Sequence, residues 1–499
     1  MTLKPGYGLV PVAFFDDNKR KWNSRVHDIP VLGAPEQLPD LKAKLDIQEA
    51  IIAMPSASAR RIGEIVNLMR QARLPCKIIP SLDQLALGQV RVSQLRNVEI
   101  QDLLGREKVE LETENIRLAL QNRVVVVTGA GGSIGSELCR QIAAYHCKHL
   151  LLLDRSEPSL FQIEQELIRL EHGHRIIPVV GDVLDRARMK EIFARFRPEV
   201  VFHAAAHKHV PMMEHQPGEA IQNNSLGTAQ LADLALEFGV DRFILISTDK
   251  AIYPSSVMGA SKRLAEIYVQ ALFAANPNRT KFMAVRFGNV LGSSGSVIPA
   301  FHRQIAEGGP VKVTHPEMTR YFMTIPEACM LVLQSAIQGA GGEIFVLDMG
   351  KPVKIVDLAR QMIELSGFKP DEDIQIEFTG VRPGEKLFEE ITRKGENFAP
   401  TTHTKIFRFL SQPADLTSFR QSLQKLRDNL HQVEADQLKL MLKAAIPDYK
   451  TSPVPDNRIG PSSTISESQL DKADAVPENV KRRKPLETVS SKPSKLPLS

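Results

Sequence analysis

The chain has 499 residues, of which 43% are hydrophobic and 24% are charged, a composition typical of a globular protein with two or three domains. Its formal charge of +5 is modest and forms no basic patch with interleaved aromatic residues, which argues against a nucleic-acid partner. The four cysteines have no metal-binding spacing and are predicted to be reduced, structural thiols in the cytoplasm. No apolar run reaches the roughly 18 residues that a membrane-spanning helix needs, so none is predicted.

The first region, residues 1–91, is predicted to form a small α/β domain. Apolar runs at 9–15, 47–54 and 76–79 indicate strands, and residues 59–72 have helical spacing. An opening strand that leads into a glycine-rich turn is absent. We therefore expect an incomplete Rossmann-like domain with a regulatory or packing role rather than independent dinucleotide binding.

The middle of the chain is predicted to hold the main domain. Residues 92–122 form a polar connector, and residues 123–410 alternate apolar strands with amphipathic helices, a pattern that predicts a doubly wound parallel sheet. A helical extension at 411–450 follows, with a pair of helices expected at 416–445.

The last region, residues 451–499, is predicted to be disordered because it is rich in Ser, Pro, Lys and Glu and almost without aromatic residues. Its basic cluster at 481–484 is a candidate for contact with anionic lipid, a peripheral membrane association. The alternative is that the cluster only keeps the tail solvated.

A cofactor site is predicted where four valines at 124–127 run into the turn TGAGGSIG and a helical pattern. Glycines in such a turn permit a tight bend, close approach of the backbone to a pyrophosphate, and close packing of helix on strand. The following helix N-terminus then faces the phosphates. The cofactor-binding residues predicted here are Thr128, Gly129, Gly132, Ser133, Ile134 and Gly135.

The adenosine end of the cofactor is predicted to meet the ends of the next two strands. Asp154 ends the second strand and can accept both ribose hydroxyls of NAD, whereas Arg155 could meet a 2′-phosphate and leaves NADP open. We favour NAD. After the third strand, Asp182 could reach the adenine amine, with Val183 beside it.

Nine motifs in one order carry a family resemblance. They are TGAGGSIG (128–135), DRSE (154–157), HAAAHKHVPMME (203–214), NSLGT (224–228), STDKA (247–251), MGASK (258–262), RFGNVLGSSGSVIP (286–299), PEMTRYFM (316–323) and GVRPGEKLFEE (380–390). Together they resemble the extended short-chain dehydrogenase/reductase family, and within it the nucleoside-diphosphate-sugar 4,6-dehydratases of surface-polysaccharide synthesis. The nearest likeness is to the large UDP-N-acetylglucosamine 4,6-dehydratases, the CapD-like group. From those proteins this sequence differs at its start, where we expect the transmembrane helices and the first β-α unit of the N-terminal domain to be missing.

The resemblance implies a lyase reaction on a UDP-sugar in a homo-oligomeric enzyme. The family oxidises C4 with bound NAD(P), loses water across C5 and C6, and returns the same hydride to C6. Ala204 and Ala205 are implied to lie beside the cofactor. The substrate-binding residues that motif position implies are Lys208, His209, Asn289, Ser296, Val297, Arg320 and Arg382. The histidines show no metal spacing, so no catalytic metal is predicted.

The chemical site is expected at Thr248, Asp249 and Lys250, because Met258 stands where such sites usually carry a catalytic tyrosine. A thioether can neither give nor take a proton. Lys250 fits the base for C5 if burial and the cation Lys262 lower its pKa, and Asp249 fits the acid if its pKa is raised. Because neighbouring Asp and Lys tend to pair, a shared proton is the better description. The proton of the 4-hydroxyl is expected to be taken by Thr248, acting as a relay, or by Asp249. Lys262 is expected to bind the nicotinamide ribose.

Two other functions stay open at this point. A UDP-sugar 4-epimerase would need no acid–base pair for C5 and C6, so the Asp249–Lys250 pair argues against it. A dTDP-glucose dehydratase would carry Asp-Glu at the same place. A catalytically silent regulator of polysaccharide assembly would account for the missing tyrosine.

Overall fold

The computed structural model of the chain describes most residues between Val10 and Thr451. The described ranges are 10–54, 57–79, 96–97, 112–170, 172–391, 397–410 and 412–451. The predicted tail with its basic cluster, and most of the predicted connector, lie outside these ranges. Within the ranges, no helix combines the length and the apolar character needed to cross a bilayer.

A nine-stranded sheet forms the centre of the main domain, in the order β20-β21-β17-β12-β11-β10-β7-β8-β9. Seven neighbouring strands, from β9 to β17, are parallel, and β21 and β20 run antiparallel at one edge. The strands are β7 (Val124–Thr128), β8 (His149–Asp154), β9 (Ile176–Val180), β10 (Val200–His203), β11 (Arg242–Thr248), β12 (Lys281–Phe287), β17 (Ile344–Leu347), β20 (Asn397–Pro400) and β21 (Ile406–Leu410). This arrangement confirms the predicted doubly wound sheet.

Helices cover both faces of the sheet, and each face has its own apolar core. Successive residues of a strand point to opposite faces, so Val124 and Val126 of β7 enter one core and Val125 and Val127 enter the other. The first core is covered by α8 (Arg186–Phe196), α11 (Gly227–Glu237), α12 (Val257–Ala275), α16 (Leu416–Asn429) and α17 (Ala435–Ala445). The second is covered by α5 (Thr113–Leu120), α6 (Ser133–Ala143), α7 (Glu157–Arg169) and α14 (Ile325–Gln338).

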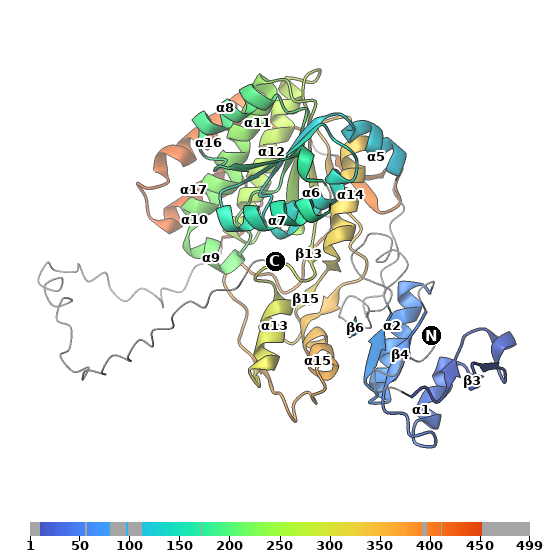
Figure 1. Cartoon of the computed structure of the whole chain (residues 1–499). Coiled ribbons are helices and arrows are strands. Elements are labelled where there is room, and N and C mark those ends of the chain that lie inside the picture. The colour runs from blue at the N-terminus through green and yellow to red at the C-terminus, as the bar shows by residue number, and fades with distance from the viewer. Residues whose placement is uncertain are drawn as a thin grey trace, which may run out of the picture. The chain divides into compact units, whose positions relative to one another are not determined.

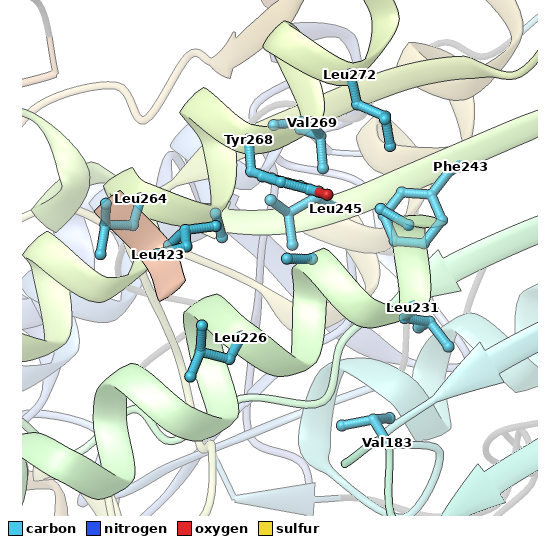
Figure 2. Close-up of a cluster of buried hydrophobic side chains, with 14 of the residues drawn as sticks. Val183, Leu226, Leu231, Phe243, Leu245, Leu264, Tyr268, Val269, Leu272 and Leu423 are labelled. Atoms are coloured by element: carbon cyan, nitrogen blue, oxygen red, sulfur yellow. The ribbon is translucent and has the colours of Figure 1, made fainter. Parts of the chain in front are cut away.

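Helix α12 packs into the first core and carries Met258 and Lys262 at its N-terminal end. Figure 2 shows Leu264, Tyr268, Val269 and Leu272 of this helix among side chains of β11, α11 and α16. Nearly every turn of α12 is buried, which fixes the direction in which its N-terminal residues point. The helices α16 and α17 that complete this face lie in the segment predicted as a helical pair.

A smaller lobe follows β12 in the chain and has a separate apolar core. It consists of α13 (Val297–Ala306), α15 (Ile355–Leu365) and the short strand pairs β13 (Asn289–Val290) with β16 (Phe322–Met323), β14 (Val311–Val313) with β19 (Ile376–Phe378), and β15 (Thr319–Arg320) with β18 (Val353–Lys354). Figure 1 shows α13, β15 and α15 gathered in this lobe. Its first strand, β13, begins two residues after β12 ends, so the lobe is attached at the carboxyl edge of the sheet.

The described residues of the first region form two small sheets. In one, β4 (Ala50–Ile52) and β5 (Cys76–Ile78) are parallel and are connected through α2 (Ala59–Gln71), with β6 (Arg96–Asn97) antiparallel at the edge. In the other, β3 (Ile29–Gly33) pairs with β1 (Phe14–Phe15) and β2 (Arg25–Val26). The helix predicted at 59–72 is present, and the predicted first strand is limited to two residues.

Candidate active site

The glycine-rich turn after β7 has the close backbone approaches that a phosphate cradle needs. Gly129 has φ +68°, and a Cβ there would lie 2.7 Å from Ala205 N. A Cβ on Gly135 would collide with the Gly129 carbonyl. Helix α6 begins at Ser133 with Gly132 as its N-cap and no side-chain cap, so its first N–H groups stay available to an anion.

The ribose-binding residue predicted at the end of β8 is held in place by backbone donors. Asp154 Oδ2 accepts from Gly131 N at 2.9 Å and Oδ1 accepts from Ser156 N at 2.8 Å. Arg155 is 55% exposed and lies 4.0 Å from Asp182 Oδ2. Asp182 also accepts from Leu184 N, while Val183 is buried in the first core. The side chains of Asp154, Arg155 and Asp182 are thus assembled at adjacent strand ends.

A buried histidine, His203, contacts side chains next to the predicted cofactor site. It was not predicted from the sequence, although it is the first residue of the HAAAHKH motif. His203 lies between the hydroxyls of Thr128 and Thr228, at 2.7 and 2.9 Å. Burial and the charge of Lys262 lower the pKa of His203 to about 3. The ring is therefore neutral and links the ends of β7 and β10, next to Ala204 and Ala205.

Helix α12 brings Met258 and Lys262 to one face by their four-residue spacing. Its N-terminus is capped by Ser256, whose hydroxyl accepts from Gly259 N at 3.1 Å. Met258 is 4% exposed and belongs to the first core. Burial lowers the pKa of Lys262 to about 8, and no hydrogen bond of its amine to another described residue contributes to this shift. Its donors are thus available to a ligand.

The predicted catalytic residues meet in the turn after β11. Thr248 Oγ1 donates to Asp249 Oδ1 at 2.9 Å, and Lys250 Nζ donates to the same oxygen at 3.1 Å. Lys250 Nζ also donates to Asn289 Oδ1 at 2.9 Å and pairs with Glu389 Oε1 at 2.8 Å. Asn289, predicted at the diphosphate, therefore lies against Lys250, and its amide nitrogen is the atom left for a substrate.

The ionisation expected from the sequence is reversed in this arrangement. Burial acts to lower the pKa of Lys250, but the charges of Asp249 and Glu389 outweigh it and raise the pKa. Burial acts to raise the pKa of Asp249, but the Lys250 charge and hydrogen bonds from its neighbours lower it. Both pKa shifts thus run opposite to those that the roles of acid and base would require, because a third charged residue joins the pair.

That residue is Glu389, in the irregular segment after β19. Only 8% of it is exposed, and its Oε1 accepts from Lys250 and from Arg320 Nε at 3.0 Å. Burial and the charge of Asp249 raise the pKa of Glu389 to about 7. Nothing in GVRPGEKLFEE distinguishes Glu389 from Glu390, since neither helical nor strand periodicity applies to this segment.

The two arginines predicted to bind substrate differ in their surroundings. Arg320 is 8% exposed, and besides Glu389 it donates to the carbonyls of Thr319 and Leu387. Arg382 has a side chain 57% exposed and pairs with Glu385 at 2.6 Å. Arg320 is therefore part of the Lys250 cluster, and Arg382 is the arginine that solvent reaches.

The remaining predicted substrate residues lie near the start of α13. Ser296 is the N-cap of this helix, Val297 its first residue, and the Ser296 hydroxyl is buried without a hydrogen-bond partner among the described residues. The ring of His209 lies against Gly295, and burial lowers the pKa of both Lys208 and His209. Ser294 N donates to Ser133 Oγ at 3.2 Å, which joins this loop to the cofactor turn.

The chain is similar to known proteins and to two protein families. Residues 125–411 match the family described as polysaccharide biosynthesis protein, and residues 1–80 match a CoA-binding domain. The chain is 51% identical to the capsular polysaccharide biosynthesis protein CapD of Staphylococcus aureus, over 80% of this chain and 67% of that protein. It is 46% identical to the probable polysaccharide biosynthesis protein EpsC of Bacillus subtilis, over 88% and 72% respectively.

A solved structure has the same fold. The X-ray structure of Pen from Bacillus thuringiensis matches with a TM-score of 0.54 and 32% identity, over 59% of this chain and 91% of that one.

Proposed function

The chain belongs to the polysaccharide biosynthesis protein family, and from that premise we propose that it catalyses the NAD-dependent 4,6-dehydration of a UDP-N-acetylhexosamine. The expected substrate is UDP-N-acetylglucosamine, and the product is a UDP-4-keto-6-deoxy sugar for surface polysaccharide synthesis. The observation that carries the proposal is the contact of Lys250 Nζ with two buried carboxylates, those of Asp249 and Glu389, after the end of β11. A C4 epimerase has no elimination across C5 and C6 to catalyse, so it needs no lysine held in this way.

The residues at the carboxyl edge of the sheet fit a dinucleotide. The Gly129 turn and the N-terminus of α6 would hold the pyrophosphate, Asp154 the adenosine ribose, and Lys262 the nicotinamide ribose. When bound, NAD accepts the hydride from C4 and returns it to C6. NADP is the alternative cofactor, because Arg155 would bind its 2′-phosphate.

The proton steps fall to the turn after β11. The Thr248 hydroxyl is already hydrogen-bonded to Asp249, so a proton from the 4-hydroxyl would pass through it to that carboxylate. Oxidation at C4 makes the C5 proton acidic, and Lys250 would take it as the base. Asp249 would then protonate the departing 6-hydroxyl. Met258 takes no part in proton transfer, since a thioether has no exchangeable proton.

The nucleotide part of the substrate would lie along the start of α13. Ser296 and Val297 would face the diphosphate with the helix N-terminus, and Arg382 would add a charge-assisted hydrogen bond to phosphate or ribose. Lys208 and His209 would line the sugar pocket.

One incubation tests the proposal. Purified protein is mixed with UDP-N-acetylglucosamine and NAD in heavy water, and the sugar product is analysed by NMR. We expect a 4-keto-6-deoxy sugar with deuterium at C5. A C4 epimer without loss of water would identify an epimerase instead, and no turnover by folded, NAD-binding protein would favour the silent regulator.

A further inference from the structure

Two buried carboxyl groups in the site, those of Asp249 and Glu389, each have one oxygen that no donor among the described residues reaches. Glu389 Oε1 is occupied by Lys250 and Arg320, whereas Glu389 Oε2 and Asp249 Oδ2 are buried and meet no N–H or O–H group among the described residues. The two carboxyls are nevertheless within hydrogen-bonding reach of each other. Two acceptor oxygens can form that bond only if one of the carboxyls carries a proton.

The cluster can supply this proton from within. With every group ionised, two carboxylates balance the ammonium of Lys250 and the guanidinium of Arg320. If one proton moves from Lys250 Nζ to Glu389 along their 2.8 Å contact, the net charge of the cluster stays the same. Because no net charge is created in a buried place, this transfer avoids the large cost of burying an unpaired ion.

We propose, on the basis of the dehydratase function above, that Glu389 is the positioning residue that takes the Lys250 proton and, as a carboxylic acid, donates a hydrogen bond to Asp249. This single transfer leaves Lys250 as a neutral amine, ready to act on C5. It also keeps Asp249 ionised and able to receive the 4-hydroxyl proton through Thr248. Neither residue then needs the separate pKa shift that its role would otherwise require.

The proton balance of the cycle closes without any external acid or base. The 4-hydroxyl proton passes through Thr248 to Asp249 as the C4 hydride leaves. The C5–H bond then breaks, its proton goes to Lys250 Nζ, and its electron pair forms the C5–C6 double bond. The C6–O bond breaks, and the hydroxyl leaves as water with the proton of Asp249. When the hydride returns to C6, Lys250 protonates C5 and is neutral again, while Glu389 has kept its proton throughout.

The surroundings of Glu389 set the expected pH dependence. The charged and titratable groups facing it are Asp249 and Lys250 from the turn after β11, and Arg320 and Tyr321 from β15 and the residue after it. Its pKa of about 7 marks where a second proton enters the cluster. Below that pH Glu389 is already protonated, so the Lys250 ammonium has no acceptor. We expect kcat/KM to fall as the pH drops through about 7.

The test replaces Glu389 by its neutral isostere, with a neighbouring glutamate as control. In Glu389→Gln we expect kcat for dehydration at neutral pH to fall by about 10²–10³-fold, with little change in KM or NAD binding. The absorbance change of bound cofactor on adding substrate should persist, because Asp249 can still receive the 4-hydroxyl proton. The acid limb of the pH profile should move to the alkaline side, toward the pKa of Lys250. Glu390→Gln removes an exposed carboxylate that pairs with Lys386, and it should behave like the unmodified protein.

The outcomes separate this inference from the proposed function. If the unmodified protein makes no dehydrated sugar, the proposed function fails. If it does, and Glu389→Gln keeps its kcat and pH profile, the role of Glu389 is wrong. Should Glu389→Gln not fold, Glu389→Asp decides. A carboxyl with a lower intrinsic pKa should recover activity and move the acid limb to lower pH, and an unmoved limb would overturn the proposal.

Discussion

Two buried charge clusters near the end of β11 differ in how readily their carboxyl groups take up a proton. In the first, Glu266 of α12 accepts from Ser247 at 2.7 Å, from Arg286 at 2.7 and 2.6 Å, and from Arg263 at 3.0 Å. Burial acts to raise the pKa of Glu266, but the charge and hydrogen bonds of Arg286 lower it to about 2. In the second, Lys250 pairs with both Asp249 and Glu389, Arg320 pairs with Glu389, and the pKa of Glu389 rises to about 7.

The difference lies in the number of donors for each carboxylate rather than in burial, which both clusters share. Around Glu266, several donors surround a single carboxylate, so protonating that carboxylate is unfavourable. The cluster therefore has a structural role. Around Lys250, two carboxylates compete for one ammonium group, and each keeps one buried oxygen without a hydrogen-bond donor among the described residues. A proton can therefore change place there at low cost, as the proposed catalysis requires.

The largest effect is expected from breaking the second cluster at its centre. Lys250→Ala removes the proposed base for C5, and we expect dehydration to fall by more than about 10³-fold while NAD affinity is kept. Product formation from UDP-N-acetylglucosamine and NAD titration measure the two quantities. Dehydration at the normal rate in this variant would exclude Lys250 as the base.

Breaking the first cluster should affect stability rather than chemistry. Glu266→Gln removes the counter-charge of the buried Arg286, and we expect a loss of about 3 kcal/mol in the free energy of unfolding at neutral pH. The folded-state pKa lies below the usual 4.5, so this stabilisation is present above pH 4.5 and is lost as the pH falls toward 2. Urea unfolding should show the two proteins converging in acid.

A surface pair provides the control for this measurement. Glu191→Gln disrupts the exposed pair of Glu191 with Arg188, and it should leave the unfolding curve almost unchanged. An equal loss in both variants would show that the Glu266 cluster has no special role.

A smaller effect is expected from the hydroxyl that connects the substrate to the second cluster. Thr248→Val keeps the size of the side chain but removes the relay to Asp249, and C4 oxidation should slow by about 10- to 100-fold. Single-turnover kinetics of the cofactor absorbance measure this step. An unchanged rate would mean that Asp249 takes the 4-hydroxyl proton directly.

The smallest effect is expected at Met258. Met258→Leu conserves volume in a residue that is 4% exposed, so we expect less than about a threefold change in the dehydration rate and a stability cost below about 1.5 kcal/mol. A large loss of rate, with the fold intact, would give the thioether a role that its chemistry does not predict.

The parts of the fold and of the site that could be predicted from the sequence are those whose residues are adjacent in the chain. The valine strand, the glycine turn and the start of α6 form one contiguous segment, so their local geometry follows from residue type and order. The alternation of apolar strands and amphipathic helices likewise predicted the doubly wound sheet. Thr248, Asp249 and Lys250 are consecutive residues at a strand end, and their proximity was equally predictable.

Only the tertiary structure decided how these residues are charged. Glu389 and Asn289 reach Lys250 from an irregular segment and a separate short strand, and no periodicity in the sequence predicts those contacts. His203 likewise gains its neutral state from burial between two threonines. The sequence by itself determined which groups can move protons, because that depends on the side chains present. Which of them holds a proton depends on burial and on charges brought from distant segments, so it was decided by the fold.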